Sequence, residues 1–261
     1  MKHGYGREKM FVWMIVLGVG VWLSSPVSAA SPDLRLTPQS IEIGAFFTGA
    51  ELKVAGEIPK GSNAVVEVVG ESHDVSLMRK GRRMGLWMNV GSLEVHHAPS
   101  VYIAGSTASE VLSKSGSDSP WGFGALEKRV VFSGDVQDGE QAALFHDFLE
   151  LKESEKLYSL LPGSVRVTGS ESDWSGVEDD VWIPAKIPPG TYHVCMSIVR
   201  DGKTVEQKCS DVQVALVGFP ALLSSMAYQH GLAYGIIAVL IAIFAGFAMG
   251  FMFKGKGGGA H

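Results

Sequence analysis

Hydrophobic positions in the first half of the chain recur mostly at every second residue, in short runs. The runs include IEIG, ELKVAGEI, NAVVEVVG, VSLMRK, GLWMNV, LEVHH and SVYIAG, and many of their residues are β-branched. Turn residues such as Pro59–Ser62 and Lys80–Gly81 separate them. Period-two alternation bounded by turn signals is typical of antiparallel strands. Several short strands at this spacing predict an antiparallel β-sandwich.

The pattern changes to a helical one between about residues 107 and 161. In GEQAALFHDFLELKESEKLYSLLPG, Leu144, Phe148 and Leu151 keep one helical face apolar, and the lysines and glutamates that follow keep another face polar. A Pro-Gly pair then ends the pattern. The segment 107–161 is therefore predicted to be a helical insertion between two groups of strands.

Strand patterns resume in SVRVTG, DVWIPAKI, GTYHVCMSIV and EQKCSDVQVALV. The sequence Arg200–Lys203 is a hairpin signal between the last two runs. Tyr192 follows a turn at the start of the penultimate strand, where immunoglobulin-like sandwiches place a corner tyrosine. The predicted fold is mostly β: an immunoglobulin-like antiparallel β-sandwich at 31–217 with a helical insertion, followed by one C-terminal transmembrane helix.

The first 30 residues have the composition of a targeting segment. Lys2, Arg7 and Lys9 precede an apolar run at Met10–Leu23, and small residues follow up to Ala30. This order predicts a secretory signal peptide at 1–30, with an uncleaved N-terminal anchor as the alternative.

The apolar stretch near the C-terminus is long enough to cross a bilayer. Leu232–Phe253 contains no charge and reaches about 33 Å as a helix, and Lys254 and Lys256 follow at once. By the positive-inside rule, the tail is predicted to be cytoplasmic and the folded domain extracytoplasmic. The predicted segments are a juxtamembrane stretch at 218–230, a transmembrane helix at 231–253 and a cytoplasmic tail at 254–261.

One face of this predicted helix carries small residues. At about 100° per residue, six of them fall within about 120° of each other: Gly231, Gly235, Ala238, Ala242, Gly246 and Gly250. Two glycine pairs, Gly231/Gly235 and Gly246/Gly250, have the small-xxx-small spacing that lets helices approach closely, although glycine and alanine are common in membrane helices. The face predicts packing on an integral membrane protein or on a second copy. His230 lies at its outer end, where it could hydrogen-bond to a partner or a headgroup.

The charge of the chain argues against nucleic acid as a partner. The formal net charge is −5, and it becomes −7 once the three basic residues and one acidic residue of 1–30 are removed. An acidic domain without a basic stripe repels phosphate backbones. The sequence contains no GxSxG, HExxH or P-loop pattern, so we expect neither an enzyme nor a cofactor.

The two cysteines, Cys195 and Cys209, lie on opposite arms of the predicted hairpin. With the turn near Asp201 and Gly202, they lie opposite each other or one residue out of register. In an oxidising compartment this arrangement predicts a cross-strand disulfide. Two separate buried thiols, or a redox or metal role, are the alternatives. The absence of CxxC removes the case for thioredoxin-like chemistry.

Histidines and tryptophans are the remaining candidates for binding. A metal site could use His96 and His97, together with His73 and His193. However, neighbouring strand residues point to opposite faces, which favours solvated or packed histidines.

The tryptophans divide by their context. Trp87 and Trp182 alternate within apolar strands and are predicted to be core residues. Trp121 and Trp174 lie in loops rich in glycine, serine and aspartate, and are predicted interaction candidates.

Five motifs in order resemble a known family. GLWMN, PSVY, FLELKESEKLY, PPGTYHV with RDGK, and HGLAYG are similar to the Alph_Pro_TM family of single-pass transmembrane proteins, best known from alphaproteobacteria. The resemblance implies a bacterial inner-membrane protein whose N-terminal domain is periplasmic. It also implies an accessory role beside permeases of the sulfite-exporter type, and it supplies no catalytic residues. The leading hypothesis is a non-enzymatic accessory or assembly subunit on a polytopic membrane protein; the alternative is a tethered periplasmic ligand- or metal-binding module.

Overall fold

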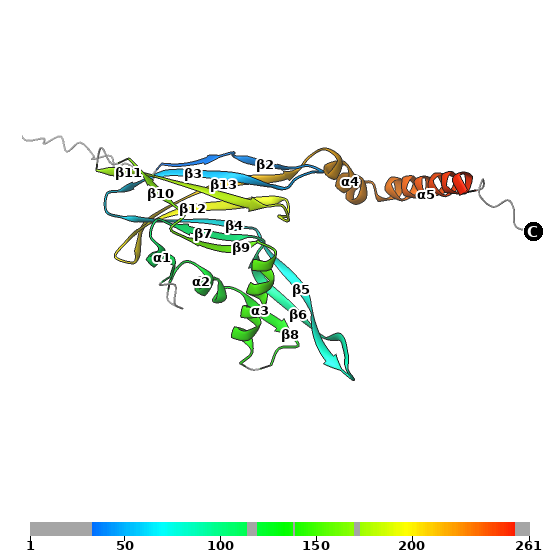
Figure 1. Ribbon diagram of the computed structural model, residues 1–261, viewed down its shortest axis with the longest axis horizontal. Helices are drawn as coiled ribbons and strands as arrows, with labels where there is room; N and C mark the ends of the chain where they lie inside the picture. Colours follow the sequence, from blue (N-terminus) through cyan, green and yellow to red (C-terminus); the bar gives the residue numbers. More distant parts are fainter. Residues whose placement is uncertain (1–32, 114–118, 138, 170–172, 254–261) are drawn as a thin grey trace, which may run out of the picture. The chain divides into compact units, whose positions relative to one another are not determined.

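The computed structural model describes residues 33–113, 119–137, 139–169 and 173–253 (Figure 1). The predicted signal peptide and cytoplasmic tail lie outside the described residues. The first sheet is antiparallel and has the strand order β1-β3-β11-β10. Its strands are β1 (Leu34–Thr37), β3 (Gly49–Pro59), β11 (Trp174–Pro184) and β10 (Arg166–Thr168).

The second sheet has the order β2-β13-β12-β4-β7-β9. Its strands are β2 (Ser40–Ile43), β13 (Lys203–Leu216), β12 (Gly190–Arg200), β4 (Asn63–Gly70), β7 (Tyr102–Ser106) and β9 (Tyr158–Pro162). The four central strands pair antiparallel, whereas β2 and β9 join the edges in parallel. The chain therefore moves from the first sheet to the second between β1 and β2.

The two sheets pack face to face around one apolar core. A methyl group built on Gly56 of β3 would lie 2.6 Å from Cε of Met196 on β12, so the sheets approach closely there. The strand order, with its first strand divided between both sheets, is that of an immunoglobulin-like β-sandwich. The hydroxyl of Tyr192 donates to the carbonyl of Pro188 at 2.8 Å, which is the hydrogen bond of a corner tyrosine.

A third sheet consists of β5 (Ser72–Arg83), β6 (Leu86–Pro99) and β8 (Val131–Gly134). The turn predicted at Lys80–Gly81 is wrong, because β5 continues through these residues and the chain turns at Met84 and Gly85 instead. Gly81 is needed for another reason. A methyl group there would lie 2.8 Å from Val90 on the neighbouring strand, so the glycine permits close packing between β5 and β6.

Three helices follow β7: α1 (Ser109–Ser113), α2 (Phe123–Glu127) and α3 (Gln141–Ser154). They fall within the predicted insertion 107–161, which also contains β8 and most of β9. The helices α2 and α3 cover the outer face of the second sheet at β7 and β9 (Figure 1). The ring of Tyr102 lies 6.3 Å from that of Phe123, and the ring of Tyr158 lies 5.9 Å from that of Phe148.

Two further helices, α4 (Gly218–Gln229) and α5 (Gly231–Phe253), end the described chain. His230 separates them, because its backbone angles, φ −132° and ψ 45°, are not helical. Its N–H donates to Met226 and its carbonyl accepts from Tyr234.

Candidate functional site

The helix α5 has the length and composition needed to cross a membrane. Its 23 residues extend about 34 Å, it contains no acidic or basic residue, and the described part of the chain buries none of it. It covers the predicted range 231–253. The described residues therefore contain one candidate membrane span.

The small-residue face of α5 is open. A methyl group built on any of its four glycines would meet no atom within 4 Å, and these glycines are Gly231, Gly235, Gly246 and Gly250. Ala238 and Ala242 are exposed on the same face. A backbone this bare can be approached closely by a second helix. The side chain of His230, at the start of this face, is also exposed.

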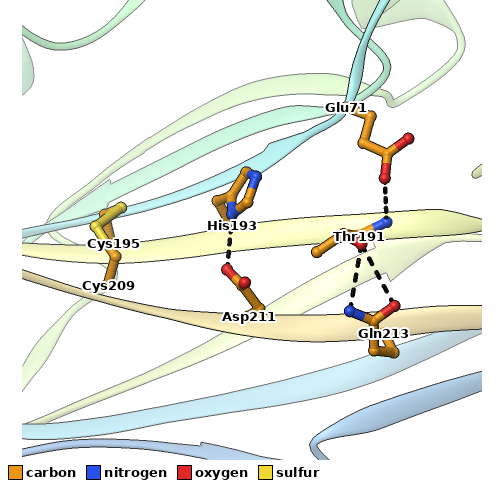
Figure 2. Close-up of polar contacts among 7 residues, drawn as sticks. All are labelled: Glu71, Thr191, His193, Cys195, Cys209, Asp211 and Gln213. Atoms are coloured by element: carbon orange, nitrogen blue, oxygen red, sulfur yellow. Dashed lines mark hydrogen bonds and ion pairs between the residues drawn. A yellow bond between two sulfur atoms is a disulfide. The ribbon is translucent and has the colours of Figure 1, made fainter.

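The outer face of β12 and β13 carries a row of polar cross-strand pairs (Figure 2). Thr191 lies opposite Gln213, His193 opposite Asp211, and Cys195 opposite Cys209. The two sulfurs form a disulfide, with Cys209 exposed and Cys195 half-buried. Of the two registers that the hairpin left open, the structure has the one with the cysteines directly opposite, and the bond lies on the outer surface of the sandwich.

The other members of the row are held by hydrogen bonds. Nδ1 of His193 lies 2.6 Å from Oδ1 of Asp211, whereas the Thr191 hydroxyl bonds to the amide of Gln213. Glu71 accepts from the backbone N–H of Thr191 at 2.8 Å, and this bond lowers the pKa of its carboxyl (Figure 2). These contacts and the disulfide link β12 to β13, and the Glu71 bond links β12 to the segment after β4.

The sequence patterns did not predict the buried polar network next to this row. The hydroxyl of Tyr102 donates to Oε1 of Glu67 at 2.6 Å and accepts from the N–H of Gly122 at 2.8 Å. Burial raises the pKa of the Glu67 carboxyl. The network attaches α2 to the sheet, and only the register of β4 and β7 places its members together.

The candidate metal-binding histidines make contacts with different protein groups. Nε2 of His96 lies 2.8 Å from the hydroxyl of Ser133, and its Nδ1 lies 3.1 Å from Asp74. The ring of His97 is 6.5 Å from that of His96. No group of three His, Cys, Asp or Glu side chains that could hold a metal ion lies among the described residues.

Three of the tryptophan predictions are wrong. Trp121 was expected on the surface and is 4% exposed, whereas Trp87 and Trp182 were expected in the core and are 73% and 56% exposed. Trp182 alternates with the buried Ile183 and lies outward against Gly49. Trp87 lies on the β5–β6 hairpin, where no second layer covers the strand. Trp174, the fourth, is half-buried at the start of β11.

The comparison with protein families agrees with this architecture. A family model described as "Putative transmembrane protein (Alph_Pro_TM)" matches residues 33–255, which include both the sandwich and the apolar helix. The search of curated proteins found no match. The chain therefore belongs to the Alph_Pro_TM family.

Proposed function

We propose that this protein is a non-enzymatic accessory or assembly subunit, anchored in the bacterial inner membrane, that docks through α5 on a polytopic membrane protein. The single observation that carries the proposal is the row of four glycines and two alanines on one face of α5. Each glycine weakens a helix by about 1 kcal/mol relative to alanine. Contact with lipid does not offset that loss, whereas the packing of a second helix on the face does.

The orientation in the proposal has two supports. Lys254 and Lys256 follow α5 directly, which favours a cytoplasmic C-terminus. The disulfide between Cys195 and Cys209 belongs to an oxidising compartment, which favours a periplasmic sandwich. A permease of the sulfite-exporter type is the partner that the family resemblance implies.

The test is co-purification of the full chain from mild detergent with its membrane partner. Gly235→Leu combined with Gly246→Leu fills the open face, and recovery of the partner should fall by about 10- to 100-fold. The matched control is Ala233→Leu with Ala248→Leu, which adds similar bulk on nearly the opposite side of the helix and should leave recovery unchanged. Equal recovery with both variants would contradict the proposal.

Crosslinking in intact membranes identifies what touches the face. A photoreactive side chain at Ala242 should form adducts with a multi-span protein, whereas the same group at Leu240, on the far side of the helix, should label lipid. If the adducts contain only a second copy of this chain, the face mediates homodimerisation, and the accessory role is contradicted.

A further inference from the structure

The end of the β5–β6 hairpin is an exposed apolar surface. All residues from 82 to 90, here named the hairpin tip, are exposed. The exposed fraction is 104% for Met84, 68% for Leu86 and 73% for Trp87. The strand β8 pairs with β6 only over Leu93–His96, so the described strands leave the tip as a two-stranded ribbon without a third neighbour (Figure 1). Exposed apolar groups gathered in this way mark an interaction surface.

The apolar side chains lie on both faces of the ribbon and at its apex. In the register of the hairpin, Trp87 lies opposite Arg82, and Leu86 lies opposite Arg83. Successive residues of a strand point to opposite faces, so each face carries one arginine and one large apolar group. A lipid layer can surround both faces and the apex of a ribbon at once, and this distribution of apolar groups fits such a layer.

The turn itself gives independent support. Met84 and Gly85 have φ values of 51° and 84°, the left-handed conformation required at both central positions of a type I′ turn. Asparagine, aspartate and glycine are the residues that favour the first of these positions, and a bulky apolar residue there is uncommon. The chain therefore places a methionine at the most exposed point of the hairpin against the local preference of the backbone.

The charge around the tip is positive in an otherwise acidic chain. Arg79, Lys80, Arg82 and Arg83 lie between Asp74 and Glu94 with no acidic residue among them. Arg79 pairs with Glu140 of the helical insertion at 3.1 Å. No described acidic residue forms an ion pair with Arg82 or Arg83. The guanidinium of Arg82 donates to the carbonyl of Gly85 at 3.5 Å, which leaves its charge without a described acidic partner. Two such cationic groups beside a tryptophan complement the anionic headgroups of a membrane surface.

The hairpin also leaves the sandwich at the end that leads to the membrane anchor. Gly70, the last residue of β4, lies opposite Tyr192, which lies opposite Val212 near the end of β13. The chain leaves β4 for the hairpin and leaves β13 for α4 and α5 at this same end. The 12 residues of β5 extend about 40 Å, against about 18 Å for the 12 residues of α4, so the hairpin is longer than the helix that precedes α5.

We propose that the hairpin tip inserts into the interfacial layer of an anionic lipid membrane, the one in which α5 is anchored. Met84, Leu86 and Trp87 enter the headgroup and upper acyl region, while Arg82 and Arg83 bind lipid phosphates. The folded domain is then held at two points. This inference requires only the membrane anchor, and it holds whether or not α5 binds a partner.

The experiment uses the full chain reconstituted into protein-free vesicles of phosphatidylcholine, with or without phosphatidylglycerol. A polarity-sensitive fluorophore is attached to Met84→Cys, with the native disulfide left oxidised. The matched control carries the fluorophore on Lys203→Cys, at the β12–β13 turn on the opposite end of the second sheet. We expect a blue-shifted emission that brominated lipids quench at position 84 and not at position 203, and a stronger effect in anionic vesicles.

Charge variants make the test sharper. Arg82→Gln with Arg83→Gln in the labelled protein should reduce tip insertion by about 30-fold in anionic vesicles and little in neutral ones. Because these side chains are exposed, the sandwich should unfold at the same temperature. Emission at position 84 that stays water-like in both kinds of vesicle would overturn the inference. So would a response that appears only when membrane proteins are added, since that would assign the tip to a protein partner.

Discussion

The hydroxyl of Tyr102 on β7 donates a 2.6 Å hydrogen bond to Oε1 of Glu67 on β4, and both residues are buried. The hydroxyl oxygen of Tyr102 also accepts a hydrogen bond from the N–H of Gly122 beside α2. Burial raises the pKa of both residues, so the phenol stays protonated and acts as the donor. One hydroxyl therefore joins the helical insertion to the second sheet.

Tyr102→Phe should destabilise the domain by about 1–3 kcal/mol, because it leaves a buried carboxyl and a buried N–H without their partner. Thermal unfolding followed by circular dichroism in mild detergent measures the change. Tyr228→Phe is the matched control, since that hydroxyl lies on a side chain that is 90% exposed. Equal shifts for the two variants would show that the network contributes nothing.

Glu67→Gln should stabilise the protein at neutral pH. The pKa of Glu67 is raised above its ordinary value of 4.5 in the folded state, so its contribution to stability is complete below that value and is lost as the pH rises through the folded pKa. The gain from Glu67→Gln should therefore be larger at about pH 8 than at about pH 5.

Glu71→Gln is the comparison variant, because the pKa of Glu71 is shifted in the opposite direction to that of Glu67. The N–H of Thr191 lowers the pKa of Glu71, so this carboxylate stabilises the fold above its unfolded pKa and stops doing so as the pH falls. The variant should therefore lose stability at about pH 8 and change less at acidic pH. The same pH trend for Glu67→Gln and Glu71→Gln would contradict the assignment of the two environments.

Removing the disulfide should weaken the fold without changing it. The cysteines are 14 residues apart and their strands are already hydrogen-bonded neighbours, so the loss should be about 3 kcal/mol at most. The measurement is the unfolding temperature with and without reductant. Cys195→Ala with Cys209→Ala should match the reduced protein and should not respond to reductant. Complete unfolding of that variant would show that the bond is required for folding.

Gly105→Ala should destabilise the sandwich by about 1–3 kcal/mol. The new methyl group would overlap the hydroxyl of Ser164 and lie 2.5 Å from Oδ2 of Asp179, which is buried between the sheets. Gly44→Ala is the control, because its methyl group would meet nothing within 4 Å. Denaturant unfolding of the two variants side by side separates a packing effect from a general effect of replacing glycine.

Local sequence patterns predicted the structure correctly where a feature is formed by residues that are close together in the chain. The run NAVVEVVG is β4, and the hairpin signal at Arg200–Lys203 joins β12 and β13. Counting from that turn placed Cys195 against Cys209, and the turn before Tyr192 gave the corner tyrosine. The apolar stretch gave α5 with its bounds, because a membrane span needs only length and the absence of charge.

Patterns failed where a second element decides the environment. Trp87 and Trp121 show the reason. The alternation around Trp87 is correct for a strand, yet the strand extends past the layer that would bury it. Trp121 has the loop composition of a surface residue, yet it is buried at the start of the segment that covers the second sheet.

The sequence by itself determined the β-rich class, the hairpin that brings the two cysteines close together and the apolar helix, since each depends on residues close together in the chain or on simple apolar length. Only the tertiary structure decided which faces are covered, that Glu67 meets Tyr102, and that the β5–β6 hairpin leaves the sandwich at the same end as the chain to α5. Period-two alternation tells which side chains share a face. What lies against that face is set by the packing of distant segments, which no local pattern encodes.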